Sequence, residues 1–274
     1  MTRCSVRPSP TTEAVTVQRI GIIGVGEIGR AIVMGLRHGE EPGPEVLLSP
    51  RGARIAAELA ERYDGVRVCA DNQEVVDGSD LVVVALRRQD WRAALAGLVV
   101  PDDRVVVNVI PGVASEELRR VLATGAALTH AIPLPTVRER RCLTVVQPSH
   151  PDADALFELL GGALPVADEA ALNVLSAVTS TQTTHYAFLA TLVSWATDQG
   201  IPVADADRFV RGLYQDVGRS LADGTRSLER LAAEHETPGG SNERVRTTWF
   251  DQANSGALRG TLDGLVGDLH GGHR

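Results

Sequence analysis

Three glycines with the spacing G-x-G-x-x-G are the first residues of the chain whose types and order indicate a chemistry. Gly24, Gly26 and Gly29 follow an apolar run at residues 19–23 and open a segment with apolar residues at every third or fourth position. In this context the first glycine permits a tight turn, the second lets backbone amides approach a pyrophosphate, and the third lets a helix pack closely on a strand. The start of the helix also favours phosphate. The motif predicts a dinucleotide site, and a glycine-rich turn without a ligand is the alternative.

The residues after the second predicted strand favour NADP(H) over NAD(H). Enzymes that use NAD place an aspartate or glutamate there, about 20 residues after the glycine motif, to bind the ribose hydroxyls. This chain has Ser49 and Arg51 instead, with Arg54 nearby. A hydroxyl and a guanidinium suit a 2′-phosphate. We therefore expect NADP(H) as the cofactor, with Arg54 either assisting or standing as a solvated helix residue.

The chain has no lysine, because all 27 of its basic residues are arginine. Schiff-base chemistry on a protein lysine, attachment of pyridoxal phosphate and the P-loop phosphate lysine are therefore excluded. Arginine stays charged at every working pH and is a poor proton shuttle. A general acid or base must be His, Tyr, Asp, Glu, Cys or a hydroxyl relay.

Two polar groups in the second half of the chain could supply such chemistry. An imidazole can act as a general acid near neutral pH, so His185 could protonate a substrate, although it could equally be a packing residue. Thr183 and Thr184 offer hydroxyls beside it, but threonines in helices often bond the preceding turn. Gly239, Gly240, Ser241 and Asn242 predict a helix start that suits a carboxylate ligand or is only a structural cap.

Residues 19–165 alternate short Val/Ile-rich runs with longer amphipathic segments, which is typical of repeated βαβ units. We expect strands at residues 19–23, 45–49, 66–68, 80–86, 104–109, 127–131 and 143–146, and crossover helices that include residues 54–63 and 115–122. The pattern changes near residues 161–167, and from there to Leu269 it is helical without a convincing strand. The expected helices are 168–178, 183–199, 204–223, 227–234 and 242–269, the last broken near residues 254–256. The predicted fold class is an α/β Rossmann-type N-terminal domain followed by an all-α C-terminal dimerisation domain.

Composition narrows the setting of this fold. A net charge of −8 without a basic stripe argues against nucleic acid, and no run of about 18 apolar residues predicts a membrane span. Three widely spaced cysteines favour a reducing compartment, so we expect a cytoplasmic protein. We expect a disordered leader at residues 1–17, an NADP-binding domain at 18–165 and a helical domain at 166–274. No metal site is expected, since His270 and His273 lie in a Gly/His tail.

After residue 18 the chain resembles the pyrroline-5-carboxylate reductase family over nearly its whole length. The resemblance rests on RIGIIGVGEIG at residues 19–29, SDLVVVAL at 79–86, IPGV at 110–113 and TPGG at 237–240. It implies hydride transfer to a cyclic imine, a helical dimerisation domain, and an active site shared between interlocked subunits, with the Pro-Gly-Gly segment near the substrate. Among the cofactor-binding positions we include six further residues: Glu27, Ile28, Ala85, Leu86, Asn108 and Pro111.

The chain departs from that family at positions that face the substrate. The family's Lys-Pro pair, its Met-Pro-Asn and its Ser-Gly-Ser-Gly-Pro-Ala-Tyr correspond here to Arg87-Arg88, Ile132-Pro133-Leu134 and residues 180–186. We therefore expect an NADPH-dependent reductase of a C=N bond in a small cyclic imine carboxylate, in proline biosynthesis or a specialised pathway. One alternative is an NADP-binding dimeric sensor without catalysis. The other is a β-hydroxyacid dehydrogenase-like enzyme, a class that relies on a lysine this chain lacks.

The helical half also predicts the assembly and the place of the active site. Ala206, Phe209, Val210, Leu213, Val217 and Leu221 form an apolar stripe at helical spacing. Such a stripe is typical of a core or a subunit interface, so we expect a homodimer through the helical domain. We expect the active site between the nicotinamide end of the sheet and the helices that carry Thr183, His185 and residues 240–242. His130 and Asn108, at the ends of strands, could contact a ligand or cap a loop.

Overall fold

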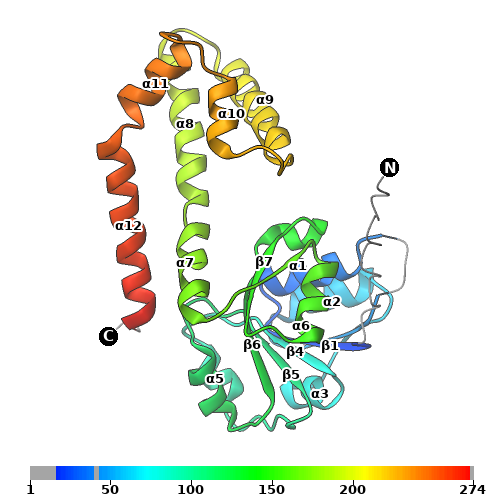
Figure 1. Cartoon of the computed structure of the whole chain (residues 1–274). Coiled ribbons are helices and arrows are strands. Elements are labelled where there is room, and N and C mark those ends of the chain that lie inside the picture. Colours follow the sequence, from blue (N-terminus) through cyan, green and yellow to red (C-terminus); the bar gives the residue numbers. More distant parts are fainter. Residues whose placement is uncertain (1–16, 40–42, 272–274) are drawn as a thin grey trace, which may run out of the picture. The chain divides into compact units, whose positions relative to one another are not determined.

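The computed structural model describes residues 17–39 and 43–271, and its chain divides into two compact units, residues 1–172 and 173–274. The first unit holds an eight-stranded sheet with helices on both faces (Figure 1). Its strands are β1 (Arg19–Ile23), β2 (Glu45–Leu48), β3 (Val66–Val68), β4 (Leu81–Val84), β5 (Val105–Asn108), β6 (Ala127–Ile132), β7 (Thr144–Gln147) and β8 (Ala163–Pro165). Its helices are α1 (Glu27–Leu36), α2 (Ala53–Arg62), α3 (Asn72–Asp77), α4 (Trp91–Leu95), α5 (Ser115–Leu122), α6 (Pro151–Leu159) and the 3-10 helix η1 (Pro135–Glu139).

The central strands are apolar on both faces because each face packs against helices. Ile20 and Ile22 of β1 lie in one buried cluster with α1, α2 and α6, whereas Ile23 lies in a second cluster with α3, α4 and α5. Successive side chains of a strand point to opposite faces, so an uninterrupted Val/Ile run is what a doubly covered strand requires. The predicted Rossmann-type fold is confirmed.

The strand order β3-β2-β1-β4-β5-β6-β7-β8 reverses direction between β1 and β4. The strands β1 to β6 are parallel, so the loops after β1, β2, β4 and β5 all emerge at one edge of the sheet. An open sheet of this kind binds ligands at this edge, where the strand order reverses. The glycine motif begins there, directly after β1.

Two features of the first unit differ from the sequence expectation. The strand β8 falls where we expected no strand. It forms one edge of the sheet and pairs in parallel with β7, which itself runs antiparallel to β6. Its three residues are too few for a clear alternating pattern, and two glycines with positive φ, Gly161 and Gly162, precede it. The short helices α3 and α4 and the 3-10 helix η1 also span fewer than two helical turns, which a periodicity search does not detect.

The second unit contains helices and, within the described residues from 173 on, no strand. The helices are α7 (Glu169–Thr179), whose start belongs to the first unit, α8 (Gln182–Asp198), α9 (Val203–Leu221), α10 (Leu228–Glu234), α11 (Ser241–Trp249) and α12 (Gln252–Gly271). The predicted break in the last helix is displaced to Phe250 and Asp251, because the Asp251 carboxylate accepts the backbone amide of Asn254 at 2.9 Å and caps a new helix there. Asn254 is therefore part of a helix and not of the break.

Some predicted features lie outside this description. Residues 1–16 of the expected leader and His273 are not among the described residues, and the side chain of His270 is not described either. Within the described ranges, no helix is long and apolar enough to cross a membrane. Likewise, the described residues contain no group of three or more His, Cys, Asp or Glu side chains arranged to hold a metal ion.

Candidate functional site

The three glycines of the motif have different structural reasons to be glycine. Gly24 has φ 98°, and a Cβ there would lie 2.5 Å from the Ala85 carbonyl oxygen of the neighbouring loop. A Cβ on Gly29 would lie 2.4 Å from the Gly24 carbonyl oxygen, so this glycine allows α1 to pack against the turn. A Cβ on Gly26 would meet no atom within 4 Å. Gly26 therefore borders open space, which is what a glycine that admits a ligand requires.

The first turn of α1 faces that space with its amides uncapped. Gly26 is the N-cap residue, it has no side chain, and no other side chain caps the helix. The first amides of a helix have no partner within the helix and carry partial positive charge. Glu27 is exposed and Ile28 is half-buried, so Glu27 leaves the turn open on the solvent side. This geometry suits a phosphate group.

Two polar side chains that we predicted to contact the cofactor hold the protein's own loops. Ser49 is fully buried, and its Oγ accepts the Gly24 amide at 3.0 Å. Asn108 is also fully buried; its Nδ2 donates to the Val113 carbonyl at 2.7 Å and its Oδ1 accepts the Ile110 amide at 3.0 Å. Burial and these bonds give both side chains a role within the fold, and their direct contact with the cofactor stays a prediction. They shape the loops after β1 and β5.

Arg51 is the exposed cation of the loop after β2, and the structure gives it a partner that the sequence did not suggest. Its Nη2 lies 3.3 Å from Oδ1 of Asp90, which follows β4. The side chains of Arg51 and Asp90 are 51% and 35% exposed. Arg54 instead pairs with Glu58 one turn along α2 at 2.5 Å. Of Arg51 and Arg54, only Arg51 therefore pairs with a residue of the loops at the strand ends.

The loops after β4 and β5 complete this edge of the sheet. The carbonyl of Ala85 lies against Gly24, Leu86 is buried, and Pro111 is exposed. Arg88 extends across to the second loop, where a Cβ on Gly112 would lie 2.8 Å from its Nη1. The structure therefore brings the predicted cofactor residues to one edge, on four adjacent strands.

His130 lies on β6 between Asn108 of β5 and Gln147 of β7. Burial lowers the pKa of His130 to about 4, because the charged imidazolium is poorly solvated there. A group with this pKa is neutral at pH 7. His130 is therefore a poor general acid at pH 7, and of the two histidines predicted near the site, His185 remains the candidate proton donor.

His185 lies in the first turn of α8, in a cluster of aromatic rings. Its ring centroid is 5.7 Å from that of Tyr214 on α9, in an edge-to-face arrangement, and Phe188 stacks on Trp249 of α11 at 5.2 Å. Thr183, Thr184 and His185 are all exposed and make no side-chain hydrogen bond within the described residues. The His185 imidazole is therefore held by ring contacts while its nitrogens stay available.

Tyr214 is a candidate that the sequence analysis missed. Burial raises the pKa of its phenol, which lies beside the His185 ring. The residue stands next to Leu213 of the apolar stripe and carries no motif of its own, so only its contact with His185 identifies it.

The segment that begins α11 combines a structural cap with one free hydroxyl. Glu243 accepts the Gly239 amide at 2.6 Å, and the Asn242 amide group donates to the His235 carbonyl at 2.6 Å. Gly239 has φ 75°, which favours glycine. Ser241 is exposed and has no side-chain partner within the described part of the chain. The Gly240 amide donates to the Thr237 carbonyl at 2.7 Å, so within the described residues the Ser241 hydroxyl and the uncapped first amides of α11 are the groups of this segment that remain available to an anion.

Within one copy of the helical unit, the two polar groups are separate. Trp249 at the end of α11 contacts Phe188, one turn from His185, whereas Ser241 is at the opposite end of α11. Eight residues of helix correspond to about 12 Å. No hydrogen bond or ring contact among the described residues joins Thr183–His185 to residues 239–242. A single chain therefore does not assemble both groups into one constellation.

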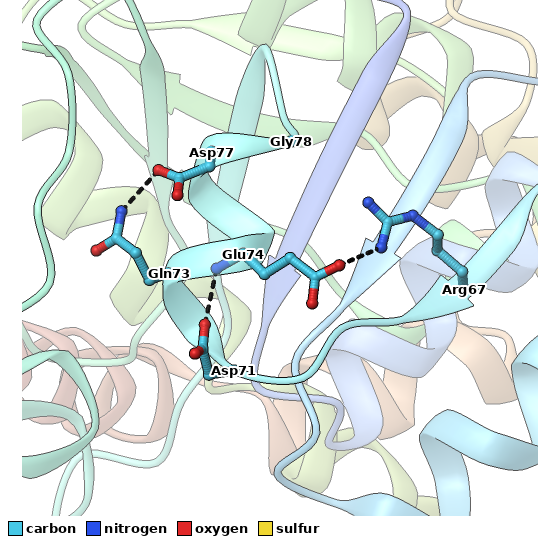
Figure 2. A pocket seen from close by; sticks show the side chains of 6 residues that line it. All are labelled: Arg67, Asp71, Gln73, Glu74, Asp77 and Gly78. Atoms are coloured by element: carbon cyan, nitrogen blue, oxygen red, sulfur yellow. Dashed lines mark hydrogen bonds and ion pairs between the residues drawn. The ribbon is translucent and has the colours of Figure 1, made fainter.

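One open surface depression lies away from all of these residues. It has a volume of about 440 Å³ and is lined by Arg67, Asp71, Gln73, Glu74, Asp77 and Gly78, at β3 and α3 (Figure 2). Its polar groups serve the structure: Asp71 caps α3 by accepting the Glu74 amide at 2.8 Å, and Glu74 pairs with Arg67 at 2.7 Å. The depression is open, and its polar side chains already bond to one another. We therefore assign it no part in the site.

Comparison with known proteins agrees with the dinucleotide geometry. Residues 19–112, from β1 to the loop after β5, match the family described as NADP oxidoreductase, coenzyme F420-dependent. The fold, the glycine loop and this match define the first unit as the nucleotide-binding part of an oxidoreductase of the Rossmann class.

Relatives over most of the chain narrow this class. Pyrroline-5-carboxylate reductase of Synechocystis is 25% identical over 227 residues, which are 79% of this chain and 81% of that protein. The enzyme of the same name from Mycobacterium tuberculosis is 26% identical over 247 residues, 82% of this chain and 77% of its own length. The solved pyrroline-5-carboxylate reductase of Coxiella burnetii matches the fold with a TM-score of 0.79 at 18% identity, covering 94% of this chain and 99% of that one. The chain is a divergent relative of the pyrroline-5-carboxylate reductases.

Proposed function

We propose that the protein is an NADPH-dependent reductase that adds hydride to the carbon of a C=N bond in a small cyclic imine carboxylate, and that it acts as a homodimer. The observation that carries the proposal is the open space beside Gly26, at the uncapped start of α1, in a chain whose curated relatives reduce pyrroline-5-carboxylate by name. The proposal includes the domain limits expected above and a cytoplasmic location, which the widely spaced cysteines support.

The residues at the edge of the sheet fit a dinucleotide. The backbone of residues 24–29 and the start of α1 would hold the pyrophosphate, and Arg51 would hold the 2′-phosphate. Ser49 and Asn108 would position these loops from below. NADPH, when bound, supplies the hydride.

The helical unit would supply the proton and hold the substrate. We assign His185 as the group that protonates the imine nitrogen, with Thr183 and Thr184 beside it. Ser241 and the uncapped first amides of α11, which follow Gly239 and Gly240, would bind the substrate carboxylate, and Asn242 would keep this turn in shape through His235. The separation of the two groups within one chain supports a site to which two subunits contribute.

Turnover tests the proposal. Purified protein is mixed with NADPH and a panel of cyclic imines with and without a carboxylate, and NADPH oxidation is followed by absorbance. We expect oxidation that depends on one class of carboxylated imine. Tight binding of NADPH without turnover on any imine would support the dimeric sensor, and oxidation with a β-keto acid but no imine would support the dehydrogenase alternative.

Replacing Arg51 by alanine should weaken NADPH binding and leave NADH binding nearly unchanged. A charge-assisted contact to phosphate contributes about 1.5 to 3 kcal/mol, and the half-exposed position of Arg51 favours the lower end, roughly tenfold in Kd. Nucleotide fluorescence titration measures both constants. The matched control is Arg54→Ala, since Arg54 pairs with Glu58 on the same helix. Equal affinity of the wild-type protein for NADH and NADPH would contradict this role for Arg51.

The exposed face of α9 supports the homodimer. Ala206 and Val210 of the predicted stripe are buried in the single chain, whereas Phe209, Leu213, Val217 and Leu221 remain exposed, Phe209 to 71%. Trp195 on α8 is also largely exposed. Continuous apolar surface of this extent indicates association. The fold match to the solved relative covers 94% of this chain and so includes most of the helical unit, and we propose a second copy of this chain as the partner.

Light scattering coupled to gel filtration should therefore give twice the chain mass of 29.1 kDa. The double variant Phe209→Glu/Leu221→Glu should dissociate the dimer at micromolar concentration, because two carboxylates per copy would be buried in an apolar interface. Val99→Glu is the control, since Val99 is equally exposed but lies in the first unit. A folded wild-type monomer at micromolar concentration would overturn the dimer.

A further inference from the structure

The ion pair between Arg51 and Asp90 connects the two loops on either side of the glycine turn. Arg51 follows β2, Asp90 follows β4, and β1 lies between these strands in the sheet. The pair therefore closes across the carboxyl end of β1, where the glycine motif begins. Its Nη2 to Oδ1 distance is 3.3 Å.

The backbone on both sides of the pair is held in place. Gly52 has φ 90°, and a Cβ there would lie 3.1 Å from the Val25 carbonyl oxygen, so the loop that carries Arg51 rests on the glycine turn. On the other side, the Asp90 amide donates to the Arg87 carbonyl at 3.0 Å and the buried Trp91 follows directly. The contact is thus between two anchored loops.

Within the described structure, the Asp90 carboxylate has no bonding partner other than Arg51. Asp90 stands at the N-cap position of α4, where an aspartate usually accepts a helix amide, but its side chain makes no such bond. Arg51 is the one ion-pair partner that the described residues give to this carboxylate. The geometry directs Asp90 toward the guanidinium instead of its own helix.

We propose that Asp90 is a specificity-determining residue: its carboxylate occupies the Arg51 guanidinium where a 2′-phosphate would bind, and so reduces the preference for NADPH over NADH. This inference rests on the proposed function. A 2′-phosphate must either displace the carboxylate from Arg51 or bind beside it, and both carry an electrostatic cost. NADH has a neutral 2′-hydroxyl and meets no such cost. Arg51 alone would therefore discriminate more strongly than Arg51 paired with Asp90.

The test compares Asp90→Asn, Asp90→Glu and wild type by fluorescence titration with NADPH and with NADH. We expect Asp90→Asn to lower the Kd for NADPH about three- to fivefold, the range of an exposed ion pair, and to change the Kd for NADH by less than about twofold. Asp90→Glu keeps the charge and should keep the wild-type ratio. Raising the salt concentration should shrink the difference between Asp90→Asn and wild type, because exposed charges are screened.

The matched control is Asp103→Asn. Asp103 is an exposed carboxylate that pairs with Arg104 at 3.4 Å and precedes β5, at the opposite edge of the sheet, so the variant removes the same charge far from Arg51. An unchanged NADPH to NADH ratio in Asp90→Asn, or an equal change in Asp103→Asn, would overturn the role of Asp90 while leaving the reductase intact. A wild-type protein that binds neither nucleotide would overturn the proposed function and this inference together.

Discussion

Gly26→Val should abolish NADPH binding while the protein stays as stable as wild type. The backbone at Gly26 is extended, with φ −89° and ψ −157°, so an L-residue fits without strain, and a Cβ meets no protein atom within 4 Å. The valine side chain would instead fill the space at the start of α1 that the pyrophosphate is proposed to occupy. Loss of two charge-assisted bonds at about 1.5 to 3 kcal/mol each corresponds to roughly 10²- to 10⁴-fold in Kd.

Titration with NADPH measures the predicted loss of binding, and thermal unfolding without nucleotide measures the predicted unchanged stability. Gly29→Ala is the contrasting variant, because its Cβ would lie 2.4 Å from the Gly24 carbonyl oxygen and must displace backbone. We expect Gly29→Ala to lower the unfolding temperature and Gly26→Val to leave it unchanged. NADPH affinity that survives Gly26→Val would show that the open space does not hold the dinucleotide.

His185→Ala should lower kcat by about 10²-fold or more with the Kd for NADPH unchanged. General acids contribute about 10² to 10⁴ in rate, and His185 is exposed at the start of α8 with no hydrogen-bond partner in the described structure. The nucleotide residues lie in the other unit, so cofactor binding should not respond. Steady-state kinetics with the imine identified by the panel gives kcat and KM separately.

Two further measurements distinguish a proton donor from a packing residue. The edge-to-face contact with Tyr214 gives His185 a structural role as well, and loss of that contact alone would lower the unfolding temperature and leave kcat near wild type. His185→Phe keeps an aromatic ring without a proton and should be as inactive as the alanine variant. Tyr214→Phe keeps the ring contact and removes the phenol, so a large loss of kcat in this variant would assign the proton to Tyr214 instead.

The sequence by itself determined the features that depend on local pattern. The spacing of Gly24, Gly26 and Gly29 after an apolar strand predicted the turn, because each glycine answers a steric requirement set within a few residues. Uninterrupted Val/Ile runs predicted strands covered on both faces, and observed strand limits differ from the expected ones by one or two residues. The apolar stripe on α9 likewise follows from helical periodicity alone.

Only the tertiary structure decided which polar side chains are free. Ser49 and Asn108 are chemically suited to a ligand, but their burial and their bonds to Gly24, Ile110 and Val113 use them within the fold. Asp90 and Tyr214 carry no motif, yet the sheet order and the packing of α8 on α9 bring them beside Arg51 and His185. The physical reason is that hydrogen bonding and ion pairing depend on distances between residues far apart in the chain, which propensity and periodicity do not encode.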